Sequence, residues 1–312
     1  MQQYDVIIIG AGPAGLTAAL YSARSKLQTL YIEKLATGGQ AATTDEIENY
    51  PGFALGVTGP ELSEQMEQQA QRFHAERLAA TVQNIELDGM YRIVKTDKGD
   101  FLTKTVIIAS GAAPKLLDVH GELEFRARGV SYCATCDAAF FEGSNIIVVG
   151  GGDSAVEEAC YLTRFAEKVT LIHRRASLRA TKIAQERALA NPKLAFMWNT
   201  VIQKIEGGDV VEKVFLKNVL NGQITEMPIE GIFIYVGIEP NTAFLKKLIE
   251  LTKQGYIPTD DYMRTEIAGI YAIGDVRDKF LRQVVTAVSD GAIAAYHAEK
   301  YIEEHFSEER PN

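Results

Sequence analysis

Two glycine-rich turns, at positions 10 and 150, constrain the fold of this chain more than any other feature. The first, Gly10-Ala-Gly-Pro-Ala-Gly15, follows the apolar run Val6–Ile9 and precedes a helical stretch that ends near Ser25. The second, Gly150-Gly-Gly-Asp-Ser-Ala155, follows Ile146–Val149 in the same way. A glycine-rich turn between a strand and a helix is typical of a βαβ unit. The 140 residues between the turns (150 − 10) are too many for neighbouring strands of one sheet, so we expect two α/β domains.

The first turn has the G-x-G-x-x-G pattern of a dinucleotide site, with Pro13 and Ala14 inside it. Gly10 permits the tight turn, Gly12 lets the backbone approach a pyrophosphate, and Gly15 allows close packing of helix on strand. The following strand ends at Glu33, 23 residues past Gly10, where a carboxylate can accept hydrogen bonds from a ribose. A carboxylate would repel a ribose phosphate, so this site suits the unphosphorylated adenosine ribose of FAD.

The second turn is followed by basic residues instead. His173 lies 23 residues past Gly150, and Arg174, Arg175 and Arg179 come after it. Guanidinium groups pair with a ribose 2′-phosphate, which favours NADPH at this site. The alternative is that Arg174-Arg175 is a solvated surface turn, and its register with the glycines argues against that. The residues expected to bind the nucleotide here are Gly150, Gly152, Asp153, Ser154, Ala155, His173, Arg174, Arg175 and Arg179.

A third motif is Cys133-Ala-Thr-Cys136, followed directly by Asp137. A zinc site needs further ligands, and the five histidines form no H-x₃₋₅-H pair, so we expect no metal. A redox-active dithiol is the better interpretation. Asp137 could supply the proton that thiol chemistry requires, although on spacing alone it could equally be a helix cap. Cys160, the remaining cysteine, is expected to pack in the core.

Length and charge exclude other classes. A chain of 312 residues suits about two domains, and a net charge of −9 argues against a nucleic-acid binder. No apolar run reaches the roughly 18 residues of a membrane span, and no basic residue precedes Arg24 as a secretory signal would require. We therefore expect a cytoplasmic protein that uses neither nucleic acid nor membrane.

The pattern between the motifs predicts further helices and strands of an α/β fold. The expected helices run from Pro60 to about Leu78 and from about Gln283 to His305. The expected strands lie within residues 82–93, 105–109, 201–205, 210–216, 232–236 and 269–273.

Taken together, the two nucleotide units, the Cys-Ala-Thr-Cys-Asp motif and the His-Arg-Arg run resemble the bacterial thioredoxin reductases of low molecular weight. The resemblance covers essentially the whole chain. It implies two Rossmann-like three-layer domains that bind FAD and NADPH, with the FAD domain discontinuous. The implied boundaries are 1–113 for the first part of the FAD domain, 114–241 for the NADPH domain with the C-x-x-C, and 242–312 for the second part of the FAD domain. It also implies a homodimer.

The same resemblance extends the expected FAD site beyond the first turn. Thr37-Gly-Gly-Gln40 and Glu48-Asn49-Tyr-Pro-Gly52 match flavin-binding loops of the family, and Gly274-Asp275 matches its second flavin motif. Val284 stands where the family commonly has Ala. The residues implied to contact FAD are Gly10, Gly12, Pro13, Ala14, Gly15, Glu33, Gly39, Gln40, Asn49, Val82, Ala109, Gly274, Asp275, Arg282, Gln283 and Val284.

The implied reaction passes electrons from NADPH through FAD to the Cys133–Cys136 disulfide and then to thioredoxin. Cys136 would face the flavin, Cys133 would attack the substrate disulfide, and Asp137 would act as acid and base. The alternatives are a ferredoxin-fed flavin reductase that has lost the NADPH site, a flavin-dependent dithiol oxidase, and a nucleotide-bound redox sensor without turnover. The intact second turn argues against the first of these.

Overall fold

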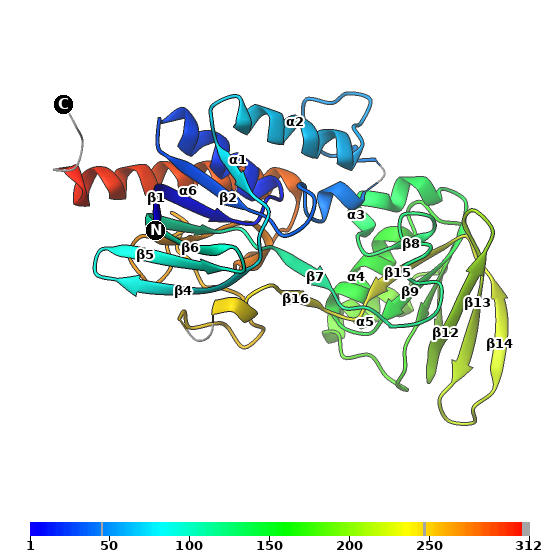
Figure 1. The fold of residues 1–312 in the computed structure, drawn as a ribbon. Helices are drawn as coiled ribbons and strands as arrows, with labels where there is room; N and C mark the ends of the chain where they lie inside the picture. Colours follow the sequence, from blue (N-terminus) through cyan, green and yellow to red (C-terminus); the bar gives the residue numbers. More distant parts are fainter. Residues whose placement is uncertain (45, 246–247, 308–312) are drawn as a thin grey trace. The chain divides into compact units, whose positions relative to one another are not determined.

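The computed structural model describes residues 1–44, 46–245 and 248–307, and the chain divides into two compact units (Figure 1). Unit 1 combines residues 1–113 with 239–312, and unit 2 spans residues 114–238. The two chain segments that connect the units, β7 (Ala112–Pro114) and β16 (Ile238–Pro240), pair as a two-stranded ribbon. The predicted domain boundaries, and the nucleotide assigned to each domain, stay predictions.

Unit 1 is built on a seven-stranded sheet in which β1 pairs in parallel with β2 and β6. The long strand β6 also pairs with β5 along its first half and with β17 along its second half. The strands are β1 (Gln2–Ile9), β2 (Thr29–Ile32), β3 (Glu76–Leu78), β4 (Val82–Asp88), β5 (Tyr91–Thr96), β6 (Gly99–Ile108) and β17 (Ile270–Ala272). The predicted strand at residues 105–109 therefore starts earlier, because the N-terminal part of β6 pairs with β1 and β5.

Helices cover one face of this sheet. Alternate residues of β1, Val6 and Ile8, pack under the helices, while Ile7 and Ile9 face a second core on the other side. Gly291 allows the closest helix contact, since a Cβ there would lie 2.4 Å from the Ala14 carbonyl oxygen. The helical segments are α1 (Pro13–Arg24), α2 (Gly59–Gln71), α6 (Val284–His305), and the short η1 (Ala41–Thr43), η3 (Ala243–Leu245) and η4 (Gly274–Val276).

The predicted helix from Pro60 to Leu78 is wrong in its second half. Helix α2 ends at Gln71, and His74 takes a left-handed conformation with φ 69°. The chain then forms β3, which pairs in parallel with β2. The composition of residues 72–78 suits a helix, and the pairing with a distant strand overrides that local preference.

Unit 2 repeats the plan with a five-stranded parallel sheet in the order β11-β10-β9-β15-β8. Ile146 and Val148 of β9 face one core, and Ile147 and Val149 face the other, which makes the unit layered. Its strands are β8 (Val130–Ser131), β9 (Asn145–Gly150), β10 (Lys168–Ile172), β11 (Leu194–Met197) and β15 (Gly231–Tyr235), with a separate antiparallel sheet of β12 (Thr200–Gly207), β13 (Val211–Asn218) and β14 (Ile224–Pro228). Its helices are α3 (Ala134–Asp137), η2 (Ala138–Phe141), α4 (Asp153–Leu162) and α5 (Lys182–Leu189).

The predicted α/β class is confirmed, with one Rossmann-like unit around each glycine turn. Within residues 1–44, 46–245 and 248–307, no helix is both long and apolar enough to cross a membrane.

Candidate functional site

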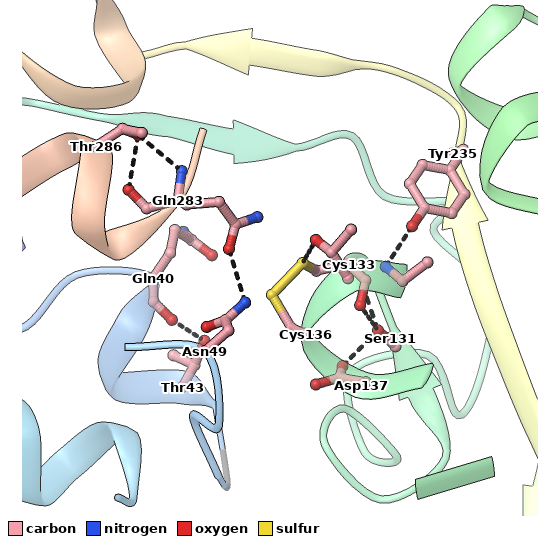
Figure 2. Close-up of a disulfide and its surroundings, with 12 residues drawn as sticks. Gln40, Thr43, Asn49, Ser131, Cys133, Cys136, Asp137, Tyr235, Gln283 and Thr286 are labelled. Carbon is pink, nitrogen blue, oxygen red and sulfur yellow. Dashed lines mark hydrogen bonds between the residues drawn. A yellow bond between two sulfur atoms is a disulfide. The ribbon is translucent and has the colours of Figure 1, made fainter. Parts of the chain in front are cut away.

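The two cysteines of the C-x-x-C motif form a disulfide at the start of α3 (Figure 2). Their Cα atoms are 5.3 Å apart, within the usual range for a disulfide. Cys133 is the N-cap of α3, and both cysteines are half-buried. The pair is therefore oxidised, accessible and held by a short helical turn.

Ser131 connects the disulfide to Asp137. Its hydroxyl donates to Oδ2 of Asp137 at 2.5 Å and accepts from the backbone N–H of Cys133 at 3.1 Å (Figure 2). Ser131 is the last residue of β8 and is buried, so both bonds are fixed by the sheet. The carboxylate that the sequence proposed as acid and base is thereby held at the end of α3. Sequence reasoning missed Ser131, although its place two residues before the motif was a signal.

Tyr235 holds the other side of the motif. Its hydroxyl accepts from the backbone N–H of Ala134 at 2.5 Å, and its own backbone is paired with Gly150 in the sheet. Burial, together with the charges of Glu158 and Asp137, raises the pKa of this phenol far above its usual value. Tyr235 therefore stays neutral, and it links the dithiol helix to the second glycine turn within one unit. A separation of 101 residues from Ala134 left no sequence signal for this contact.

The first glycine turn has the close approaches that its motif requires. Gly10 has φ +106°, and a Cβ there would lie 2.3 Å from the Ala109 carbonyl oxygen. A Cβ on Gly15 would lie 2.0 Å from the carbonyl oxygen of Gly10. Gly12 is different, because a Cβ there would have only the Gly38 oxygen within 4 Å, at 3.9 Å. Gly10 and Gly15 are thus needed for packing, whereas a Cβ on Gly12 would meet no close neighbour among the described residues.

A phosphate group fits at the open end of this turn. Helix α1 has Gly12 as its N-cap, no side chain caps it, and its first residue is Pro13. The N–H groups of the first helical turn have no intrahelical partner and attract negative charge. Glu33 accepts from the backbone N–H of Ala11 at 3.0 Å and of Leu35 at 3.1 Å, so its carboxylate is placed beside the turn. These features fit the diphosphate and ribose of FAD.

Segments far away in the sequence complete this site. Gly39 lies against Gly12, since a Cβ on Gly39 would be 3.3 Å from the Cα atom of Gly12. Gly274 lies against Ala14, since a Cβ on Gly274 would be 3.0 Å from the Cβ atom of Ala14. The Asn49 amide donates to Oε1 of Gln283 at 3.1 Å (Figure 2). Each of these contacts joins two residues that the sequence predicted to bind the same cofactor.

Asp275 follows Gly274 in η4 and is the charged group of this segment. Burial raises the pKa of its carboxyl group, and the nearby Lys279 and Arg282 oppose that shift. Arg282 also stacks over the ring of Tyr256, with 4.3 Å to its centroid. No described residue forms a hydrogen bond or ion pair with the Asp275 carboxylate, which leaves it available for a polar group of the cofactor.

Three predicted residues have different surroundings. Val82 starts β4 and packs against the core that contains Ile9 and Ile32, on the sheet face away from the helices. Gln40 precedes η1, and its carbonyl oxygen accepts from Thr43. Val284 is the first residue of α6 and packs against the small core of Ile47, Val57 and Leu62. The contacts of Val82 do not join it to the glycine turn.

The side chain of His173 packs against the second glycine turn. A Cβ on Gly151 would lie 2.3 Å from the His173 ring, so only glycine leaves room for the imidazole. The ring is buried, and its Nε2 has no hydrogen-bond partner in the described part of the chain. Burial, followed by the charges of Arg179, Arg175 and Arg174, lowers the pKa of His173. The imidazole is therefore neutral at neutral pH.

The basic cluster and the helix end lie around that ring. Helix α4 has Gly152 as an N-cap without a side-chain cap, and among the described residues nothing beyond its chain neighbours lies within 4 Å of a Cβ placed there. The backbone N–H of Arg179 donates to the Gly151 carbonyl oxygen at 2.7 Å, which brings the arginine loop to the turn. The side chains of Arg174, Arg175 and Arg179 are exposed. An uncapped helix end beside exposed guanidinium groups fits a dinucleotide with an extra phosphate.

Two further predictions concern Asp153 and Cys160. Asp153 accepts from the backbone N–H of Thr181 at 2.7 Å, which lowers the pKa of its carboxyl group and ties α4 to the start of α5. Cys160 is half-buried rather than fully buried, packs against the core of unit 2, and has its thiol pKa raised by burial. No group of three or more potential ligands that could hold a metal ion occurs among the described residues.

Comparisons with known proteins agree with this geometry. The pyridine nucleotide-disulphide oxidoreductase family matches residues 4–291. The thioredoxin reductase of Peptoclostridium litorale is 52% identical over 311 residues, which are 98% of this chain and 99% of the relative. That of Bacillus subtilis (strain 168) is 49% identical over 303 residues, 96% of this chain and 95% of the relative. The crystal structure of thioredoxin reductase from Streptococcus pyogenes MGAS5005 is 52% identical with a TM-score of 0.94, and the match covers 97% of this chain and 99% of that one.

Proposed function

This chain belongs to the thioredoxin reductase family of pyridine nucleotide-disulphide oxidoreductases, and from that premise we propose that it reduces the disulfide of a thioredoxin with electrons from NADPH. The observation that carries the proposal is the accessible Cys133–Cys136 disulfide, which lies in the same unit as a glycine turn followed by three exposed arginines. A dithiol and a nucleotide turn suited to NADPH are two elements that this reaction needs.

The cofactors of the family are FAD and NADPH. We assign FAD to unit 1, where Gly12, Glu33 and Asp275 would hold its diphosphate and ribose. We assign NADPH to unit 2, where Arg174, Arg175 and Arg179 would pair with its 2′-phosphate. When bound, the flavin carries the two electrons that opening a disulfide requires.

The residues of unit 2 then carry out the thiol chemistry. Opening the Cys133–Cys136 disulfide yields two sulfur groups and consumes two electrons and up to two protons. Asp137, held by Ser131, is placed to give and take a proton at the thiol pair. Cys133 attacks one sulfur of the substrate disulfide, the other sulfur leaves as a thiolate, and Cys136 then attacks Cys133 to release the reduced substrate. A homodimer in the cytoplasm is the expected setting.

An anaerobic titration with NADPH tests the proposal. The purified yellow protein should take up about four electrons per chain, two for the flavin and two for the disulfide. Cys133→Ser and Cys136→Ser should each take up about two, keep their FAD, and fail to reduce thioredoxin. Loss of FAD from Cys136→Ser would mean that the cysteines are structural. Slow NADPH oxidation with thioredoxin, together with oxygen consumption when a dithiol is the reductant, would make the protein a dithiol oxidase.

A further inference from the structure

We propose that Thr135, between the two cysteines, is a catalytic residue whose hydroxyl stabilises the thiolate of Cys133. This inference rests on the proposed function, because it concerns the nucleophile of that reaction. The Oγ1 atom of Thr135 lies 3.5 Å from Sγ of Cys133. A sulfur atom in a disulfide carries no hydrogen, so in this contact the hydroxyl donates and the sulfur accepts. A hydrogen bond to sulfur strengthens when the sulfur becomes negatively charged.

Four backbone donors close to Cys133 along the chain already have other acceptors. The N–H of Cys133 donates to the Ser131 hydroxyl, and the N–H of Ala134 donates to the Tyr235 hydroxyl. The N–H groups of Cys136 and Asp137 both donate to the carbonyl oxygen of Cys133, at 3.3 and 3.2 Å. These four N–H groups are therefore committed to oxygen atoms, whereas the hydroxyl of Thr135 contacts the sulfur itself.

The titratable side chains around α3 within unit 2 do not favour a thiolate. Asp137 is on α3 itself, Glu157 and Glu158 are on the packed helix α4, and Tyr235 is on β15. Burial and the charge of Glu157 raise the pKa of Glu158. These three carboxyl groups and the phenol cannot stabilise the negative charge of a Cys133 thiolate. A neutral hydroxyl donor can do so without adding charge of its own.

The step in which Thr135 acts balances without any further reagent. The Cys133 thiolate forms a bond to one sulfur of the substrate disulfide, and the substrate S–S bond breaks. Its electron pair goes to the leaving sulfur, which takes up a proton. When Cys136 closes the disulfide, the two electrons of the dithiol have passed to the substrate. Thr135 donates its hydrogen bond to the Cys133 sulfur before the attack and loses or gains no atom.

The pH dependence of Cys133 alkylation tests the proposal. FAD-loaded protein carrying Cys136→Ser is treated with iodoacetamide, and the rate of modification at Cys133 is followed by peptide mass across a range of pH. A hydrogen bond to a charged group should be worth about one unit in the midpoint of that profile. Thr135→Val, which keeps the shape and removes the hydroxyl, should raise the midpoint by about one unit. Thr135→Ala should do the same.

Thr135→Ser is the matched control, because it keeps the hydroxyl, and its midpoint should stay within about 0.3 unit of the parent. An unchanged midpoint in Thr135→Val and Thr135→Ala would overturn the proposal. So would an equal shift in Thr135→Ser, since shape rather than the hydroxyl would then matter. The assay contains no thioredoxin, so a failure to reduce thioredoxin would defeat the proposed function and leave this result standing.

Discussion

In the first glycine turn the side chain 23 residues past the first glycine is Glu33, and in the second it is His173. Glu33 accepts a hydrogen bond from the N–H of Ala11, whereas the buried His173 ring packs against Gly151, where a Cβ would lie 2.3 Å from it. The same position in the motif therefore contacts the turn in both units, through a hydrogen bond in one and through packing in the other. In our assignment, the charges around this position select the nucleotide.

The two turns also differ in where their neighbours come from. The first is completed by Gly39 and by Gly274, which lies more than 250 residues further along the chain. The second is completed by the loop directly after β10, which carries His173 and Arg179, and by Tyr235 on β15, which pairs with Gly150. Both turns therefore depend on distant segments, and the separation along the chain is larger in unit 1.

The largest expected effect comes from removing the charges of the second site. Replacing Arg174 and Arg175 with Ala should lower kcat/KM for NADPH by roughly 10²–10⁴-fold, because a charge-assisted hydrogen bond contributes about 1.5–3 kcal/mol. With NADH, which lacks the 2′-phosphate, kcat/KM should barely change. Steady-state kinetics with both nucleotides measures this. Equal losses with both would show that the arginines stabilise the loop and do not read the phosphate.

The next effect concerns the long-range part of the first site. Buried Asp290 on α6 accepts from the N–H of Gly274 at 3.0 Å and forms ion pairs with Lys279 at 2.7 Å and Arg277 at 3.3 Å. Asp290→Asn should leave Lys279 buried without its partner and cost about 3–5 kcal/mol. We expect lower thermal stability and loss of FAD on dilution, measured by calorimetry and flavin fluorescence. Glu304→Gln, an exposed change on the same helix, should alter neither.

A smaller effect is expected at Glu33. Glu33→Gln keeps the size of the side chain and removes the charge that accepts from Ala11 and, in our assignment, from the ribose. The dissociation constant for FAD should rise roughly tenfold, in line with the loss of one charge-assisted hydrogen bond. Titration of the cofactor-free protein with FAD measures it. The exposed Glu64→Gln should bind like the parent, and a parental affinity for Glu33→Gln would remove Glu33 from the FAD site.

The sequence was sufficient for the parts that depend on local spacing. The two turns, the residues 23 positions beyond them and the C-x-x-C each follow from a run of neighbouring residues, and the structure holds them in place as strand, turn and helix. The order of strands in unit 1 was less accessible. Residues 72–78 were expected to be helical, and instead the last three of them form β3, because β2 offers its free edge to them.

What the sequence could not predict are the residues that hold the site in place from a distance. Tyr235 contacts Ala134 across 101 residues, and Asp290 on helix α6 accepts a hydrogen bond from the N–H of Gly274. A tyrosine at the end of a strand and an aspartate within a helix carry no motif. Only the folded chain shows that one hydroxyl and one carboxylate hold the backbone of two functional segments.

The smallest expected effect tests His173 through pH. Its pKa is lowered in the folded chain, whereas an unfolded histidine has a pKa of about 6.5. As the pH falls below about 6.5, the unfolded chain binds a proton that the folded chain does not bind. The free energy of unfolding of unit 2 should therefore fall with decreasing pH, by at most about 1.4 kcal/mol per pH unit from this group, until the lower folded pKa is reached.

Urea titrations followed by fluorescence of Trp198 measure this, because the single tryptophan of the chain lies in unit 2 and packs against its core. In His173→Asn the side chain stays polar and nothing titrates, so the variant should lose this part of the slope below pH 6.5. His74→Asn, at an exposed left-handed position where Asn is tolerated, should keep the parental slope. If His173→Asn also keeps the parental slope, the imidazole is not held neutral beside the turn. The comparison between Glu33 and His173 then fails.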